Sequence, residues 1–378
     1  MKFNKNVYAE INLDNLKYNF NLIKSINKGK KIIAVVKEDA YGHGAVEISK
    51  ELVRCGVDML AVIKIEEAIE LRENGINIPI LIFGVTPIEY LNELLKYELT
   101  QTITSFEYAI LLLKELKKVN KILKVHIKIE TGMGRVGLIA SDENLKIVNN
   151  IFINPFFDVE GIYSHFSDAD NDDESYTLTQ YQLFNLFCNN LDKLKLNIKY
   201  KHICNSAGSI KFPNFNGDAI RPGIILYGYN LIEDKQHISF KSVMSLKARI
   251  VHIKEVHKGE SIGYGRTYKA NEKKIIATIN VGYGSGYPRY LSNKGKVLLN
   301  GVYCDIVGNI CMDHTMIDIT SVENVKLFDE VVLIGKSIDK FIYATDICKF
   351  GETICYEVLC GIGRRIPRVY IKDSKVLN

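Results

Sequence analysis

Basic and hydroxyl side chains recur in this chain next to short apolar runs. Lys37 follows the apolar run 32–36, and Tyr41 comes four residues later. A lysine that leaves a buried strand is partly desolvated, so its pKa falls and its amine can act as a nucleophile or a base. The structural alternative is a lysine whose stem lies along the sheet while its ammonium reaches water.

Further polar groups stand near the ends of later strand-like runs. They are Lys128 and Arg135 around the run 124–130, His165 in the run 159–166, Asn205 and Ser206 after the run 200–204, and Arg221, Gly223 and Ile224 in the run 219–227. Each has an ordinary explanation: a core histidine with its bonds satisfied, a helix cap, an ion-paired arginine or a turn glycine. Their joint occurrence at strand ends favours one common site.

A lysine combined with a phosphate site predicts one of two chemistries. Glycines and a serine after the last two strands of a barrel commonly bind phosphate. Such a site beside a lysine favours pyridoxal phosphate held as a Schiff base. A sugar-phosphate aldolase uses the same two features, and the residues alone leave both interpretations open.

The elements that position these groups alternate between strand and helix up to about residue 229. Strands are predicted at 32–37, 59–63, 79–84, 100–104, 124–130, 159–166, 200–204 and 219–227. Helices are predicted from an N-cap at Asp14 to about Lys28, and at 66–73, 90–97 and 110–119. Eight such units predict a (β/α)8 TIM-type barrel. A doubly wound open sheet is the rival, weakened because no G-x-G-x-x-G follows the first strand.

Short alternating runs replace the helical pattern beyond the barrel, which predicts a mostly-β C-terminal domain from about residue 240 with one helix near 344–350. A linker is expected at 229–240. We therefore divide the chain into a cofactor-binding barrel at 1–238 and a β domain at 239–378. The strand-like segment within 1–11 is expected to pair with the β domain.

Composition excludes several classes of protein. The chain of 378 residues carries a net charge of only +5 and no basic block interleaved with aromatics, so nucleic acid is not an expected partner. No apolar run is long enough to cross a membrane, and the first residues lack the apolar stretch of a secretory signal, so we expect a cytoplasmic protein. The eight cysteines show no metal-binding spacing. We expect them to be reduced, with no metal bound.

The motifs around these residues give the chain a wider resemblance. They are A-V-V-K-E-D-A-Y-G-H-G (34–44), K-I-E-T-G-M-G-R-V-G (128–137), E-G-I-Y-S-H-F-S-D-A-D (160–170), N-S-A-G (205–208), R-P-G-I-I-L-Y-G (221–228), M-S-L-K-A-R-I (244–250), G-Y-G-R-T-Y (263–268), G-Y-G-S-G-Y-P-R (282–289), C-M-D (311–313) and Y-E-V-L-C (356–360). With them the chain resembles the alanine racemase family from its N-terminus to its last strand. The lysine motif with its Y-G-H-G tail is highly specific.

The resemblance implies a pyridoxal-phosphate enzyme that interconverts L- and D-alanine as a head-to-tail homodimer, supplying D-alanine for peptidoglycan. Lys37 matches the lysine that forms the Schiff base. Tyr264, in the β domain, matches the second catalytic base and would come from the partner subunit. Arg221 matches the arginine that hydrogen-bonds the pyridine nitrogen. His165 matches the histidine that, with Arg221, adjusts the pKa of the catalytic tyrosine.

Other positions match family residues that bind the cofactor or the substrate. Those matching phosphate-binding positions are Tyr41, Ser206, Gly223, Ile224 and Tyr356. Arg135 matches the arginine near the cofactor's phenolic oxygen and the substrate carboxylate. Lys128 matches a lysine often carbamylated to hold that arginine, and Asn205 is a supporting position. Met312 and Asp313 match the substrate-side loop of the partner subunit.

A two-base mechanism follows from this assignment. Racemisation needs a base on one face of Cα and an acid on the other, and Lys37 and Tyr264 would be that pair. A tyrosine with a pKa near 10 needs a cationic neighbourhood, here Arg221 and His165, to act at neutral pH. Arg221 cannot accept a proton, so the pyridine nitrogen stays unprotonated, which favours reprotonation over transamination.

Four positions depart from the family pattern: Ser285, Asn309, His314 and Gly361, where aspartate, arginine, glutamine and a bulkier residue are common. None is a catalytic position. Ser285 and Asn309 are expected near the substrate entrance or the dimer seam.

Other substrates and other enzymes of similar architecture are the alternatives. Tyr356 should keep the side-chain pocket small and favour alanine; a serine racemase or a broad-spectrum racemase is the alternative. Decarboxylases of basic amino acids share the architecture but place a glutamate at the pyridine nitrogen. Pyridoxal-phosphate homeostasis proteins are a barrel alone and lack a β domain.

Overall fold

The computed structural model describes residues 6–232 and 238–377. The chain folds into two compact units. The barrel unit comprises Leu16–Ala40 and Ala45–Lys241; the β unit comprises Met1–Asn15, Tyr41–Gly44 and Ser242–Asn378. Part of the strand expected within 1–11 and part of the linker expected at 229–240 lie outside the described residues.

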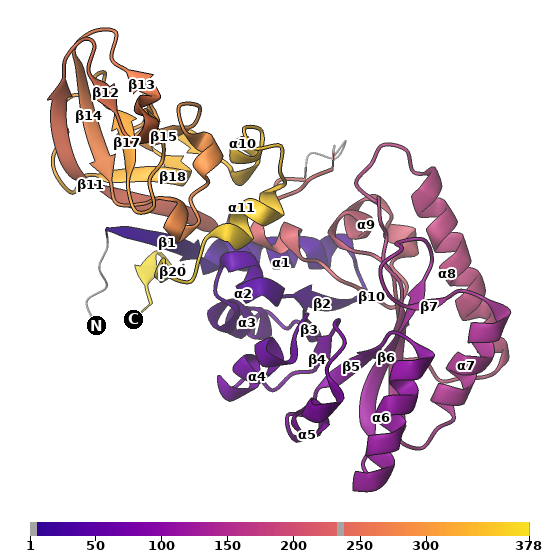
Figure 1. Ribbon diagram of the computed structural model, residues 1–378. Coiled ribbons are helices and arrows are strands. Elements are labelled where there is room, and N and C mark those ends of the chain that lie inside the picture. Colours follow the sequence, from indigo (N-terminus) through magenta and orange to yellow (C-terminus); the bar gives the residue numbers. More distant parts are fainter. Residues whose placement is uncertain (1–5, 233–237, 378) are drawn as a thin grey trace. The chain divides into compact units, whose positions relative to one another are not determined.

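Eight parallel strands form the barrel (Figure 1). Their order is β10 (Ala219–Ile220), β2 (Lys31–Val35), β3 (Met59–Val62), β4 (Ile80–Ile82), β5 (Thr100–Ile103), β6 (Leu123–Glu130), β8 (Phe157–Tyr163) and β9 (Tyr200–His202). The Asp218 N–H donates to the Lys201 carbonyl at 2.8 Å, and the Arg221 N–H donates to the Cys204 carbonyl at 3.0 Å. These bonds join β9 to β10 and nearly close the sheet, so the predicted barrel is confirmed.

Helices cover the outside of the barrel (Figure 1). They are α1 (Leu13–Ile26), α3 (Ala45–Arg54), α4 (Ile65–Glu73), α5 (Leu91–Lys96), α6 (Phe106–Val119), α7 (Asp142–Phe152), α8 (Ser175–Lys193) and α9 (Ser206–Lys211). Every residue of β3, β4 and β5 is buried. Helices on one face and the barrel interior on the other explain why these strands show no alternation with polar residues.

Some predicted boundaries were wrong. The strand expected over 219–227 ends at Ile220, because Pro222 has no N–H to donate and Ile224–Tyr227 form the short 3₁₀ helix η3. Asp14 is not the cap of the first helix. The Asn12 Oδ1 accepts a hydrogen bond from the Asn15 N–H at 2.9 Å, so Asn12 caps α1 and Asp14 lies in its first turn.

The β unit is organised around the long strand β11 (Met244–Val256). The main order is β16 (Val302–Asp305), β15 (Lys296–Leu299), β18 (Glu330–Ser337), β11, β1 (Val7–Asn12), β20 (Arg368–Lys372) and β21 (Lys375–Val376). β14 (Lys274–Ile279) pairs with β11 and β17 (Thr315–Asp318), and β19 (Lys340–Ile342) pairs with β18. The N-terminal strand β1 thus lies between β11 and β20. The helix predicted at 344–350 is α10 (Ala344–Cys348), whereas α11 (Cys355–Gly361) was not predicted.

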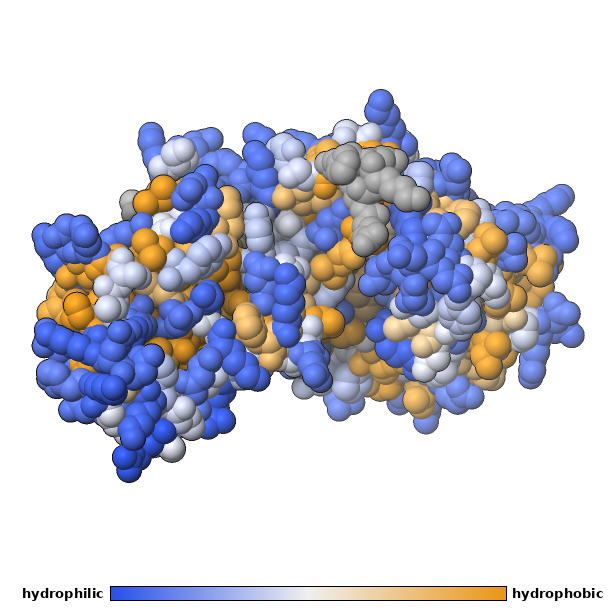
Figure 2. Space-filling view, turned by 90° about the horizontal axis from the view of Figure 1, so that it is seen from above, coloured by the Kyte–Doolittle hydropathy of each residue, from blue (hydrophilic) through white to orange (hydrophobic). Residues whose placement is uncertain are grey.

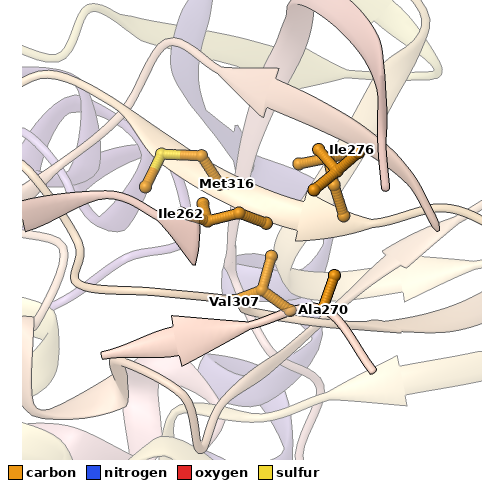
Figure 3. Close-up of a cluster of buried hydrophobic side chains, with 6 residues drawn as sticks. Ile262, Ala270, Ile276, Val307 and Met316 are labelled. Carbon is orange, nitrogen blue, oxygen red and sulfur yellow. The ribbon is translucent and has the colours of Figure 1, made fainter. Parts of the chain in front are cut away.

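A cluster of buried apolar side chains lies within the β unit (Figure 3). Its members are Val256, Ile262, Ala270, Ile276, Val307 and Met316. Ile262 belongs to β12 (Ser261–Ile262), which pairs with β13 (Tyr268–Lys269). The segment between these two strands contains the 3₁₀ turn η4 (Tyr264–Arg266). Burial of Ile262 therefore anchors the base of the turn that carries Tyr264.

Two kinds of feature are missing from the described part of the chain. Over residues 6–232 and 238–377, no helix is long and apolar enough to cross a membrane, and no group of three or more metal-ligating side chains occurs. Five cysteines, Cys188, Cys204, Cys304, Cys348 and Cys355, are buried like small apolar residues. On the face seen in Figure 2, hydrophobic and hydrophilic residues are intermixed.

Candidate active site

Arg221 lies at the centre of the groups that gather at the C-terminal ends of the barrel strands. Its side chain is 3% exposed. Its Nη2 donates to the carbonyls of Ser164 (2.7 Å) and Ile203 (2.9 Å) and to His165 Nδ1 (3.1 Å), and its Nη1 donates to His202 Nδ1 (2.7 Å). The Nε–H takes part in none of these bonds. A guanidinium only donates, so both imidazoles accept at Nδ1.

A second histidine extends this network. Because His202 accepts at Nδ1, its proton sits on Nε2 and is donated to His126 Nδ1 at 3.0 Å. Burial, reinforced by the charge of Arg221, lowers the pKa of His126 to about 3 and holds the pKa values of His202 and His165 well below their ordinary value. The resulting chain of neutral imidazoles orients the Arg221 guanidinium.

Sequence reasoning missed His126 and His202. Both stand inside strand-like runs, in K-V-H-I-K and Y-K-H-I-C, and both are fully buried. A polar residue in a strand buried on both faces needs a partner, and that requirement was the available signal. The Tyr163 ring stacks on His202 at 4.9 Å and 4° between planes, and its hydroxyl bonds with Thr102 Oγ1 at 3.1 Å.

Lys128 points into the barrel from β6 and is 2% exposed. Its Nζ donates to the Ile129 carbonyl at 2.8 Å. No carboxylate of the described chain lies within ion-pair distance of it, so the pair with Glu130 or Asp158 that an ordinary buried lysine would form is not made. Burial, reinforced by Arg221, lowers the pKa of Lys128 to about 7. This lysine therefore holds a substantial fraction of neutral amine near neutral pH.

The residues after β9 and β10 that were predicted to bind phosphate lie close together. The Asn205 Oδ1 accepts from the Gly208 N–H at 2.9 Å, so Asn205 caps α9, and the capping alternative applies to it. Ser206 is the first residue of α9, and its Oγ accepts from the Gly223 N–H at 2.9 Å. Ile224 follows Gly223 and is buried. The bond between Ser206 and Gly223 thus joins the two segments expected to cradle a phosphate.

Lys37 opens a strained turn. It is the first residue of α2 (Lys37–Gly42), just beyond the end of β2. The next four residues, Glu38, Asp39, Ala40 and Tyr41, have φ between 51° and 54°. A left-handed turn of L-residues costs about 1–2 kcal/mol per residue, and such strain clusters at functional sites. The Glu67 carboxylate supports this turn by accepting from the Glu38 N–H at 2.5 Å and the Ile63 N–H at 2.9 Å.

Four positive charges act on His165. The charges that lower its pKa, after burial, are those of Arg221, Arg135, Lys128 and Lys37. Arg135 itself follows a loop in which the Glu130 carboxylate accepts backbone N–H groups, including that of Arg135 at 3.4 Å. Of these four cations, Arg221 and Lys128 are buried, and buried positive charges are stabilised by anions. The barrel site therefore suits a multiply negative ligand.

Tyr41 belongs to the β unit, together with Tyr356 of α11. Their ring centroids lie 6.0 Å apart, and burial raises the pKa of Tyr41 above its ordinary range. Arg368 fixes the end of this turn: its Nε and Nη2 donate to the Gly42 carbonyl at 3.0 and 2.8 Å. Its other donors reach the carbonyls of Gly363, Ile366 and Ile362. Arg368 is therefore a clamp beside Tyr41.

The remaining predicted residues lie at the surface of the β unit. Tyr264 is 75% exposed and Met312 is 54% exposed. The Met312 carbonyl accepts from the Gly284 N–H at 2.9 Å, and Asp313 lies 3.5 Å from an Arg365 nitrogen.

Asn309, one of the four departures, contacts the Tyr264 turn directly. Its Nδ2 donates to the Tyr264 carbonyl at 2.8 Å. The sequence predicted that Asn309 lies near the substrate entrance or the dimer seam, but it did not predict this hydrogen bond to Tyr264.

Comparisons with known proteins give one consistent result. The model of the alanine racemase N-terminal domain matches residues 11–231, and that of the C-terminal domain matches residues 243–370. Alanine racemase 1 of Clostridium acetobutylicum is 45% identical over 98% of this chain and 97% of its own length. The solved alanine racemase of Clostridium difficile 630 has a TM-score of 0.95 at 39% identity, covering 100% of this chain and 98% of that one. The alanine racemase of Bartonella henselae, solved with covalently bound pyridoxal phosphate, has a TM-score of 0.87 at 28% identity, covering 97% and 99%.

Proposed function

The chain belongs to the alanine racemase family and is an isomerase that racemises alanine, and we propose that it does so with pyridoxal phosphate held at the Arg221 network. One observation carries the proposal. Arg221 is buried among neutral histidines and carbonyls, with its Nε–H engaged in none of its four bonds. A heterocyclic nitrogen that accepts this N–H fits the donor set, and the surrounding cations fit a phosphate.

Pyridoxal phosphate supplies an electron sink that acidifies the Cα–H of an attached amino acid. Lys37 would provide the amine that holds the cofactor. Ser206, Gly223 and Ile224 would hold the phosphate, and Tyr41 and Tyr356 match phosphate-binding positions of the family. Burial lowers the pKa of Arg221 to about 10, so the guanidinium stays charged at neutral pH and donates a hydrogen bond without giving up its proton.

Two bases on opposite faces move the Cα proton. Lys37 serves one face, and Tyr264 of a second copy of the chain serves the other. Because His165 accepts from Arg221 at Nδ1, its Nε2–H is left to donate to the Tyr264 phenolate. Exposure of Tyr264 and Met312 on the single chain supports a homodimer with shared sites, since both side chains would be covered by the second copy.

The substrate carboxylate pairs with Arg135, and Met312 and Asp313 border the substrate. The neutral amine fraction of Lys128 is the form that reacts with carbon dioxide, and the resulting negative carbamate holds Arg135. A serine racemase or a broad-spectrum racemase is not favoured, because the matched relative at 45% identity is an alanine racemase.

Two other rivals are also less favoured. Arg221 stands where a decarboxylase of basic amino acids would carry glutamate, and a homeostasis protein would lack the β unit. We propose that residues 1–238 form the cofactor-binding domain, except that the first strand, β1, pairs within the β unit, and that residues 239–378 carry the second base. We further propose that the enzyme makes D-alanine for peptidoglycan in the cytoplasm.

Borohydride trapping tests the cofactor assignment. The purified protein should carry a visible cofactor band that borohydride bleaches, and peptide mass spectrometry should place the reduced adduct on Lys37. The band should be lost in Lys37→Ala and kept in Lys28→Ala, an exposed lysine of the same unit. L-alanine should be converted to D-alanine faster than L-serine or L-lysine is inverted. If no amino acid is inverted, the proposal is wrong.

Complementation between two inactive variants tests the shared site. Lys37→Ala and Tyr264→Phe should each be inactive as homodimers. Random mixing makes half the dimers heterodimers, each with one intact site if Lys37 and Tyr264 come from different chains. About a quarter of the wild-type activity should then return. No recovery after verified subunit exchange would place both bases in one chain.

A further inference from the structure

We infer that Asn309 is a positioning residue that holds the turn carrying Tyr264. The inference rests on the proposed role of Tyr264 as the second base and identifies what fixes that base in space. Asn309 does not touch the reacting atoms. It acts through the Tyr264 backbone.

The position of Tyr264 is set by its backbone more than by its side chain. With 75% of the side chain exposed, few contacts within the described chain hold the ring. The residue stands between Gly263 (φ 72°) and Gly265 (φ 71°), a conformation that favours glycine on both sides. Two adjoining glycines give the free turn many alternative conformations. A base that must reach one face of Cα therefore needs an external restraint.

Asn309 supplies that restraint. Its Nδ2 donates to the Tyr264 carbonyl at 2.8 Å, and the same nitrogen lies 3.4 Å from where a Cβ on Gly265 would be. On the other side of Tyr264, a Cβ on Gly263 would lie 3.4 Å from the Asn309 backbone nitrogen. Asn309 thus packs against both glycines and bonds the carbonyl between them. A short amide fits this space.

The segment around Asn309 is itself immobilised, so the restraint is rigid. The Asn293 Oδ1 accepts from the Gly308 N–H at 2.6 Å, and its Nδ2 donates to Thr267 Oγ1 at 3.0 Å. The Ser292 Oγ accepts from the Ile310 N–H at 3.0 Å. Residues 308–310 and the Tyr264 turn therefore share one hydrogen-bonded frame.

Apolar packing also holds residues 308–310 and the Tyr264 turn in place. Ile262 and Val307, each just ahead of one of the two segments, belong to the buried cluster in Figure 3. With both segments anchored at their bases, the bond from Asn309 to Tyr264 is a cross-link between them at the surface.

Isotope effects separate positioning from simple loss of structure. The two alanine enantiomers have equal free energy in water, so any variant must lose kcat/KM equally in both directions. The primary isotope effect with Cα-deuterated alanine reports which proton removal limits the rate. If the Tyr264 step alone slows, this effect rises in the direction in which Tyr264 removes the proton and falls in the other direction.

The variants are Asn309→Ala and the nearly isosteric Asn309→Asp, which lacks the donor. Loss of one partly exposed hydrogen bond should lower kcat/KM roughly three- to tenfold. The isotope effects should move oppositely in the two directions. The exposed Asn271→Ala is the matched control and should keep wild-type values. Circular dichroism and the cofactor band verify that each variant is folded and loaded; Asn309→Asp keeps the side-chain volume if Asn309→Ala fails to fold.

Two results would overturn the inference. Wild-type isotope effects in both directions, in a folded Asn309 variant, would show that the residue does not act on the Tyr264 step, whether or not the rate falls. Tyr264→Phe distinguishes this from failure of the proposed function. If Tyr264→Phe still racemises alanine, Tyr264 is not the base and both proposals fail. If it is inactive while the Asn309 variants keep wild-type isotope effects, only the inference fails.

Discussion

A methyl group at Gly161 should disrupt the histidine chain behind Arg221. Gly161 lies in β8 opposite His126, where the pairing of β6 and β8 shifts register. A Cβ at this position would lie 2.7, 2.8 and 2.9 Å from three atoms of the His126 ring. The neighbouring strands are buried, so the ring cannot turn aside into solvent.

The size of the effect follows from these distances. Ordinary contact begins near 3.4 Å, so the ring must move by about 0.7 Å. A shift of that size is enough to break the 3.0 Å bond between His126 and His202. Overpacking costs about 1–3 kcal/mol, and an unsatisfied buried polar group costs about 1–3 kcal/mol more. Gly161→Ala should thus lose about 2–6 kcal/mol, which lowers the thermal midpoint by roughly 5–15 °C.

A double-mutant cycle isolates the cause. In a His126→Ala background the clashing ring is gone, so adding Gly161→Ala should lower the midpoint by less than half as much. Gly361→Ala is the matched control, because its nearest neighbour would lie 3.9 Å from the new Cβ. Equal losses from Gly161→Ala in both backgrounds would refute the assignment of the clash to His126.

Three further perturbations test other parts of the structure. Burial lowers the pKa of Lys128 from 10.5 to about 7, so between these pH values the unfolded chain binds more protons than the folded chain, and the stability of the wild type should rise with pH above about 7. In CO2-free buffer, the thermal midpoint of Lys128→Met should therefore exceed that of the wild type most at pH 6 and progressively less by pH 9. A difference that stays constant with pH would contradict this. Arg368→Lys keeps the positive charge but loses the paired N–H donors that hold the Gly42 carbonyl beside Tyr41. The apoprotein of this variant should bind pyridoxal phosphate about tenfold more weakly in a fluorescence titration, whereas the variant Lys375→Ala, at an exposed lysine, should bind it normally. Equal affinities of the two variants would exclude a clamp function for Arg368. Asn205→Ala removes the α9 cap and should cost about 1 kcal/mol, and an unchanged thermal midpoint would show that Ser206 alone holds this end of the helix.

The sequence was most informative where one local rule decides the structure. Apolar runs such as those of β3 and β4 predict buried parallel strands because helices and barrel interior leave no solvated face. The last strand was overestimated because its β-branched residues continue past Pro222, where the missing N–H ends pairing. Neither α10 nor α11 is long enough for a clear helical period, and of the two only α10 was predicted.

The candidate site was predictable only in part, for a similar reason. Lys37 and Ser206 stand at the ends of strand-like runs and Arg221 lies within one, so all three could be found by position. The support from His126 depends on a register shift and on the missing side chain of Gly161 across the strand pair. The bond from Asn309 to Tyr264 joins segments 45 residues apart. Such interactions depend on tertiary geometry that periodicity does not encode.

The left-handed turn after Lys37 has a consequence for chirality within the protein itself. The φ of 53° at Ala40 is disfavoured for an L-residue but is the ordinary helical value for its mirror image. A semisynthetic chain with D-alanine at position 40 should therefore keep this backbone and relax it, where the same replacement in a right-handed helix such as α6 would break the helix. This enzyme, which inverts alanine, thus contains an alanine, Ala40, whose backbone conformation suits the D-enantiomer better than the L-enantiomer.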